Sequence, residues 1–281
     1  MGQTIACTNQ KGGVGKTTTV VNLATYLALL GDRVLVIDLD PQGNATSGFG
    51  IDRSTVSGST YDALVDGVPL SSLHVPTAVE GLHLVPSSIA LAGAEIELAT
   101  AEARERRLGR AVRAEHDAWD WILVDCPPSL GLLTVNALTG ADAVLIPIQC
   151  EYYALEGLTQ LIATVNLVRD HLNPDLGISG VVLTMYDART NLSGEVASEV
   201  RRHLHEAVFD TIVPRSVRLS EAPSHGRPIA LYRPESKGAE AYAALARELR
   251  ARRVGASWAR NSTAPAPVAG GTGSALAGLP A

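Results

Sequence analysis

The sequence predicts an α/β fold with a doubly wound, mostly parallel sheet flanked by helices. Short apolar, β-branched runs such as VLVI, WILV and VLIPI alternate along the chain with longer helical patterns. Several runs are apolar at nearly every position, as expected for strands that helices cover on both faces. With 281 residues, 46% of them hydrophobic, the chain is long enough to bury a large core.

The expected elements follow one another in a regular order. Strands are predicted at residues 4–8, 33–38, 82–86, 121–126, 143–148, 180–185 and 211–214, and helices at 17–30, 96–115, 155–172, 194–205 and 239–253. The first helix is closed by Gly31, which suits a helix C-terminus. Residues 1–253 are therefore expected to form one domain. Residues 254–281 hold a single charge, Arg260, among Ala, Gly, Pro, Ser and Thr, and this tail is expected to be disordered.

Composition excludes several classes of protein. No run of about 18 apolar residues occurs, so a membrane span is not expected. The N-terminus has no basic region and reads as a strand rather than a signal peptide. Three scattered cysteines fit a reducing cytoplasm, and they form no C-x-x-C pair for a metal or iron–sulfur site.

The stretch TNQKGGVGKTTT, residues 8–19, lies between the first strand and the first helix. It approximates the phosphate-binding pattern G-x-x-x-x-G-K-[ST], with Gln10 at the place of the first glycine. Lys16 is expected to neutralise the β/γ-phosphate oxygens and Thr17 to ligate Mg²⁺. A chance glycine-rich turn is the alternative, which the flanking strand and helix disfavour. Lys11 is a second lysine in a chain that has only three, and the ordinary pattern does not require it.

Carboxylates stand at the ends of two predicted strands. Asp38 and Asp40 end the strand in VLVIDLDPQGNATSGFG, and Asp125 ends the one in WDWILVDCPPSLG. Open α/β sheets bind ligands at the carboxyl ends of their strands. Asp125 and Asp38 are therefore expected to reach Mg²⁺ through water, and a carboxylate here can also orient a water for attack on a γ-phosphate. Solvated carboxylates at the start of ordinary loops remain the alternative.

Six segments together resemble a known family. QKGGVGKTTT, DLDPQGNATSG, DCPPSLGLLTVNAL, QCEYYALEGL, TMYDARTNLS and PRSVRLSEAPSHGRPI stand in the order seen in ParA/Soj-type chromosome-partitioning ATPases, and the likeness covers residues 2–252. The resemblance implies a deviant Walker A loop, K-G-G-x-x-K-[ST]. It implies that ATP is bound by Lys11, Gly12, Gly13, Val14, Gly15, Lys16, Thr17 and Thr18, with Pro214 near the adenine.

The same resemblance implies a catalytic group of Lys11, Lys16 and Asp40. Lys11 would cross the interface of an ATP-dependent homodimer to the partner's phosphates, and Asp40 would position the hydrolytic water. Arg189 and Arg218 would bind double-stranded DNA without sequence preference, although residues 186–233 hold seven arginines against six acidic residues, which also fits an ordinary mixed-charge surface. A ParB-type centromere-binding protein would stimulate hydrolysis, and the protein would be cytoplasmic and nucleoid-associated.

Three rival functions share parts of this pattern. A MinD-like, membrane-associated positioning ATPase needs a C-terminal amphipathic anchor, which the tail lacks. An electron-transfer ATPase like the nitrogenase iron protein needs a cluster-binding cysteine pair from each subunit, which the spacing does not supply. A nucleotide-switch regulator of replication initiation remains open as an additional role.

Overall fold

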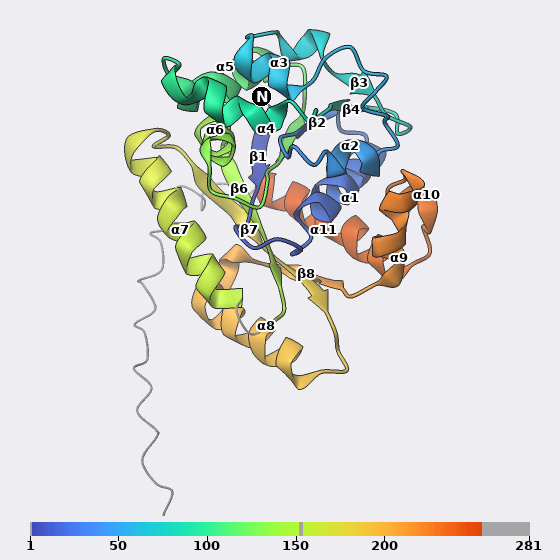
Figure 1. Cartoon of the computed structure of the whole chain (residues 1–281). Coiled ribbons are helices and arrows are strands. Elements are labelled where there is room, and N and C mark those ends of the chain that lie inside the picture. Colours follow the sequence, from blue (N-terminus) through green and yellow to red (C-terminus); the bar gives the residue numbers. More distant parts are fainter. Residues whose placement is uncertain (1, 152–153, 255–281) are drawn as a thin grey trace, which may run out of the picture.

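An eight-stranded sheet organises the chain in the computed structural model, which describes residues 2–151 and 154–254 (Figure 1). The strand order is β3-β4-β2-β5-β1-β6-β7-β8, and every neighbouring pair is parallel except β3 with β4. The strands are β1 (Gln3–Cys7), β2 (Val34–Asp38), β3 (Val75–Pro76), β4 (Leu82–Val85), β5 (Trp121–Asp125), β6 (Ala143–Gln149), β7 (Gly177–Tyr186) and β8 (Val208–Pro214).

Helices connect the parallel strands and cover both faces of the sheet (Figure 1). They are α1 (Lys16–Leu29), α2 (Asn44–Gly48), α3 (Thr60–Val65), α4 (Leu91–Glu97), α5 (Arg107–Glu115), α6 (Leu132–Gly140), α7 (Ala154–His171), α8 (Asn191–Leu204), α9 (Val217–Glu221), α10 (Ile229–Tyr232) and α11 (Lys237–Val254). Short 3-10 turns lie among them, including η2 (Leu98–Thr100), η3 (Arg104–Arg106) and η5 (Ala222–His225). The predicted doubly wound α/β fold is confirmed.

The core is divided by the sheet into two clusters. Because successive side chains of a strand point to opposite faces, Ile5 packs in one cluster and its neighbour Ala6 in the other. The cluster that contains Ile5 includes side chains of α1, α2, α9, α10 and α11. The cluster that contains Ala6 includes side chains of α3 to α8. Strands buried on both faces explain the continuous apolar runs in the sequence.

The seven predicted strands are present, with shifted ends. The largest shifts are in β7 and β8, which begin three residues earlier than predicted, at Gly177 and Val208. The two-residue strand β3 was not predicted, and it pairs antiparallel with β4 at the edge of the sheet. Such a short segment carries too few residues for an alternating pattern to be recognised.

The predicted single helix over residues 96–115 is wrong. α4 ends at Glu97, and α5 begins only at Arg107. Between them Ala103 has a φ of 48°, a left-handed conformation that interrupts helical hydrogen bonding. The Asn136 side chain of α6 stabilises the break, because it accepts the Leu108 N–H at 3.2 Å and donates to the Arg104 carbonyl at 2.8 Å. A contact from a distant helix therefore overrides the local preference for helix.

Other differences concern short or terminal segments. Helices α2, α3, α6, α9 and α10 were not predicted, and most of them have too few turns to show a period. α11 agrees with the predicted closing helix at 239–253, and it packs against α1 and β8. The predicted disordered tail lies, apart from Val254, outside the described residues. Among the helices of the described segments, none combines the length and the apolar character needed to cross a membrane.

Candidate functional site

The loop between β1 and α1 presents main-chain N–H groups at the start of a helix. Gly13 and Gly15 have φ values of 75° and 87°, which a residue with a side chain rarely adopts. Gly15 is the N-cap of α1, and no side chain of the described residues caps this end. The first N–H groups of α1 are therefore available to an anion, which the helix dipole also favours.

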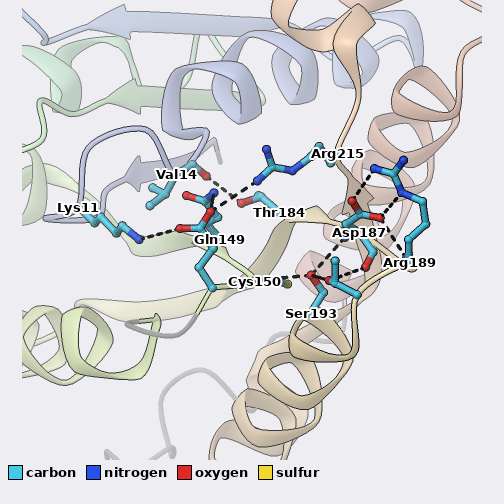
Figure 2. A network of polar contacts seen from close by, with 11 residues as sticks. Lys11, Val14, Gln149, Cys150, Thr184, Asp187, Arg189, Ser193 and Arg215 are labelled. Atoms are coloured by element: carbon cyan, nitrogen blue, oxygen red, sulfur yellow. Dashed lines mark hydrogen bonds and ion pairs between the residues drawn. The ribbon is translucent and has the colours of Figure 1, made fainter.

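Neighbouring strands hold this loop in place. The Asn9 side chain donates to the Pro147 carbonyl of β6 at 2.7 Å and accepts the Lys11 N–H at 3.0 Å. On the other side, the Thr184 hydroxyl of β7 donates to the Val14 carbonyl at 2.8 Å (Figure 2). Hydrogen bonds to β6 and β7 thus stabilise the conformation of the loop.

Lys16 is a buried cation beside this loop. Only 6% of the residue is exposed, and its ammonium donates to the Lys11 carbonyl at 3.3 Å. A buried ammonium is costly unless an anion or several acceptors compensate it. The position of Lys16 therefore suits a ligand that brings negative charge to the cavity.

Thr17 and Asp125 form a candidate site for a divalent cation. The Thr17 hydroxyl donates to Asp125 Oδ2 at 2.7 Å, and the other oxygen, Oδ1, is buried without a hydrogen bond among the described residues. Burial, and next the charge of Asp38, raise the pKa of Asp125 well above its usual range. A cation or its water shell would supply the missing partner of Oδ1 and lower that pKa. These residues fit Mg²⁺, which prefers hard oxygen ligands and retained waters.

Asp38 lies beside Asp125 on the adjacent strand but has other partners. The two residues are paired in the register of β2 and β5. Asp38 accepts the Thr46 N–H at 2.8 Å and hydroxyl at 2.6 Å, and the Asp40 N–H at 3.2 Å. Burial raises the pKa of Asp38 to about 6 despite these bonds. Asp38 thus shapes the turn after β2, and these three bonds leave it less available to a magnesium shell than Asp125.

Asp40 lines the same cavity as the loop. The residue is 6% exposed, and its Oδ1 accepts the Gln42 N–H at 2.9 Å. The Ser87 hydroxyl donates to its carbonyl at 2.6 Å, which ties the segment to the end of β4. A carboxylate fixed in this way, in the same cavity as the start of α1, can orient a water molecule.

A cavity of about 620 Å³ joins the loop to Asp40. Its lining includes Gly13, Lys16, Thr17 and Asp40, together with residues of α2, η5 and the start of α10. A second cavity of about 290 Å³ shares Gly15, Thr18 and Met185 with the first and is lined by Pro214 and Arg215. Pro214 therefore lies where an extension of a phosphate ligand could reach it. Asn22, Asn44, Met185 and Arg227 also belong to these linings. Sequence reasoning gave them no role, although Asn44, Met185 and Arg227 stand in the segments that resemble the family.

The Lys11 side chain contacts a carboxylate. Its ammonium lies 3.3 Å from Glu151 Oε2, just after β6 (Figure 2). The side chains of Lys11 and Glu151 are 40% and 45% exposed. The structure thus separates the two lysines of the loop: Lys16 is inside the cavity and Lys11 is at the surface.

Arg189 and Arg218 lie on the surface, outside both cavities. The Arg189 guanidinium forms a bidentate pair with Asp187, at 2.9 and 2.7 Å, and its side chain is 86% exposed. Arg218 pairs with Glu221 at 2.7 Å. These pairs raise the pKa of both arginines and lower those of their carboxylates, chiefly through the hydrogen bonds. These ion pairs fit the alternative of a mixed-charge surface, and the prediction that both arginines bind DNA stays a prediction.

Comparisons with known proteins find relatives that match most of the chain. A family model described as an AAA domain matches residues 2–178. The sporulation initiation inhibitor protein Soj of Bacillus subtilis is 59% identical over 251 residues, which are 89% of this chain and 99% of that protein. The chromosome partitioning protein ParA of Myxococcus xanthus is 54% identical, over 89% of this chain and 88% of that one.

A solved structure shows the same fold with a ligand. Cobyrinic acid a,c-diamide synthase from Mycobacterium smegmatis, with bound ATP analogue and magnesium, superposes with a TM-score of 0.79. It is 38% identical, and the alignment covers 90% of this chain and 96% of that chain.

Proposed function

This chain belongs to the Soj/ParA family of chromosome-partitioning ATPases, and on that premise we propose that it is an ATP-driven switch that partitions DNA. The observation that carries the proposal is the convergence of Lys16, Thr17 and Asp40 on one cavity, beside an uncapped helix N-terminus. Asp125 joins this group through its hydrogen bond with Thr17. The triphosphate of ATP supplies the anion that the loop and Lys16 require.

Thr17 would hold Mg²⁺, and Asp125 would reach the ion through water or through Thr17. The magnesium bound to the related synthase supports the presence of the ion. When bound, the ion would supply charge neutralisation at the triphosphate. Asp40 orients a water whose oxygen bonds to the γ-phosphorus. The bond from that phosphorus to the bridging oxygen breaks, ADP and phosphate are released, and one proton passes to solvent.

ATP occupancy also controls assembly in the proposed mechanism. Two subunits face each other, and Lys11 of each contacts the phosphates of the partner's ATP. The exposure of Lys11 supports this role, because its ammonium lies at the surface rather than in its own cavity. Two nucleotides that face each other bring many negative charges together, and the Lys11 ammonium of the opposite subunit offsets this repulsion when ATP is bound. Dimerisation then becomes an ATP-dependent switch.

The ATP-bound dimer binds double-stranded DNA without sequence preference through Arg189 and Arg218, and a ParB-type centromere-binding protein stimulates hydrolysis and release. Exposure of both guanidinium groups supports the DNA contact, which requires local rather than net positive charge. In the cell the protein is cytoplasmic and associated with the nucleoid.

The test is DNA binding by the purified protein with Mg-ATP, Mg-ADP or no nucleotide, with and without a candidate ParB-type partner. We expect ATP-dependent, salt-sensitive binding, slow hydrolysis, and faster hydrolysis with partner and DNA together. Binding that is independent of ATP would contradict the switch. ATP-dependent sedimentation with liposomes, rather than with DNA, would support the MinD-like alternative.

A further inference from the structure

The ammonium of Lys11 already has an anionic partner within its own chain. Glu151 Oε2 lies 3.3 Å from Lys11 Nζ. The other oxygen, Oε1, accepts a hydrogen bond from Gln149 Nε2 and lies 3.5 Å from the Arg215 guanidinium. Figure 2 shows the side chains of Lys11, Gln149 and Arg215, which come from the loop before α1, from β6 and from the segment after β8. One carboxylate thus contacts Lys11 and Arg215, which are distant from it in the sequence, and its near neighbour Gln149.

The position of Glu151 follows from the sheet. β6 is the parallel neighbour of β1, and Glu151 comes two residues after it. The Glu151 N–H donates to the Gln149 carbonyl at 2.8 Å, and the Cys150 N–H donates to the Thr184 carbonyl of β7 at 3.2 Å. Asn9 ties the phosphate loop to the same strand at Pro147. The main chain of Glu151 is therefore held beside the loop.

Resting on the proposed function, we propose that Glu151 is an intramolecular latch that competes with the partner's ATP for Lys11 and so opposes dimerisation. In the single subunit the carboxylate takes the place of the phosphate. In the dimer Lys11 must leave Glu151 before it contacts the partner's nucleotide. Arg215 and Gln149 then remain with Glu151, so the carboxylate is not left unpaired.

The latch is expected to be weak enough to open. Both side chains are nearly half exposed, and ion pairs of this kind contribute little in water. Each dimer opens two latches, so their effects combine. We expect loss of the latch to lower the dimer dissociation constant by about three- to tenfold. High salt should reduce the difference in dissociation constant between the variant and wild type.

The experiment compares Glu151→Gln with wild type and with Glu235→Gln, an exposed glutamate that removes the same charge elsewhere. Sedimentation over a range of protein concentrations, with Mg²⁺ and a non-hydrolysable ATP analogue, gives the dimer dissociation constant. Glu151→Gln should dimerise at lower concentration, and Glu235→Gln should match wild type. Glu151→Asp shortens the side chain by one methylene, so its dissociation constant should lie between those of wild type and Glu151→Gln. This variant provides a second test if Glu151→Gln folds poorly.

A dissociation constant for Glu151→Gln equal to or above that of wild type would overturn the latch. Lys11→Ala separates this result from a failure of the proposed function. If Lys11→Ala abolishes the ATP dimer while Glu151→Gln changes nothing, only the latch is wrong. If Lys11→Ala dimerises like wild type, the cross-subunit role of Lys11 is wrong, and the latch with it.

Discussion

The cavity around Lys16 and the surface that carries Arg189 and Arg218 use positive charge in different ways. Lys16 is almost fully buried and donates to a main-chain carbonyl, so a phosphate that enters the cavity adds an interaction. Arg189 and Arg218 are exposed and each is paired with a carboxylate, so a DNA phosphate must replace an existing partner. This difference predicts that the Lys16 cavity binds phosphate strongly and in a defined geometry. It predicts that the arginine surface binds DNA phosphates weakly and in a salt-dependent way.

The largest expected effect comes from removing the buried cation. Lys16→Ala should abolish measurable ATP binding or lower ATP turnover by about 100- to 1,000-fold, because a preorganised donor in a water-poor site is removed. Nucleotide binding by fluorescence and phosphate release measure the effect. Lys237→Ala, at the start of α11, removes the only lysine outside the loop and should be neutral. An equal loss in both variants would show that net charge, rather than the cavity, binds the nucleotide.

The next effect separates binding from hydrolysis within the same cavity. Asp40→Asn should keep ATP affinity within a few-fold of wild type but lower turnover by about 100-fold or more, because the amide orients water poorly. Single-turnover phosphate release and equilibrium binding are measured side by side. Asp175→Asn, in the exposed turn before β7, is the matched control. Loss of ATP binding equal to the loss of turnover would assign Asp40 to the ligand itself instead of the water.

Parts of the molecule differ in how far the sequence predicts them. The phosphate loop, Asp38 and Asp125 were predicted to lie together, because local patterns place them at the carboxyl ends of parallel strands. In the structure β1, β5 and β2 are neighbours, so these carboxyl ends lie side by side. The break at Ala103 was not predicted, since it depends on Asn136 from another helix. The pairing of Lys11 with Glu151 joins residues 140 positions apart, which no local pattern reveals.

At the arginine surface, single substitutions should change the salt dependence of DNA binding more than its sequence preference. Arg189→Ala and Arg218→Ala should each weaken ATP-dependent DNA binding. The plot of the logarithm of the binding constant against the logarithm of the salt concentration should become shallower, by about 0.9 for each DNA phosphate that the complex no longer neutralises. Titrations at several salt concentrations measure the slope. Arg110→Ala, an exposed arginine on α5, should leave it unchanged. Equal slopes in all four proteins would place the DNA-binding surface elsewhere.

The smallest expected effect comes from Asp187, the carboxylate from which Arg189 must separate before it contacts a DNA phosphate. Asp187→Asn should strengthen ATP-dependent DNA binding a few-fold, because the guanidinium no longer has an anionic partner within the chain while the amide oxygen can still accept the Arg189 N–H. Asp175→Asn removes the same charge, so it separates the local release of Arg189 from a change in net charge. The gain should also disappear in an Arg189→Ala background. If Asp187→Asn and Asp175→Asn bind DNA equally well, the pair does not compete with DNA, and the distinction drawn between the two regions fails at this residue.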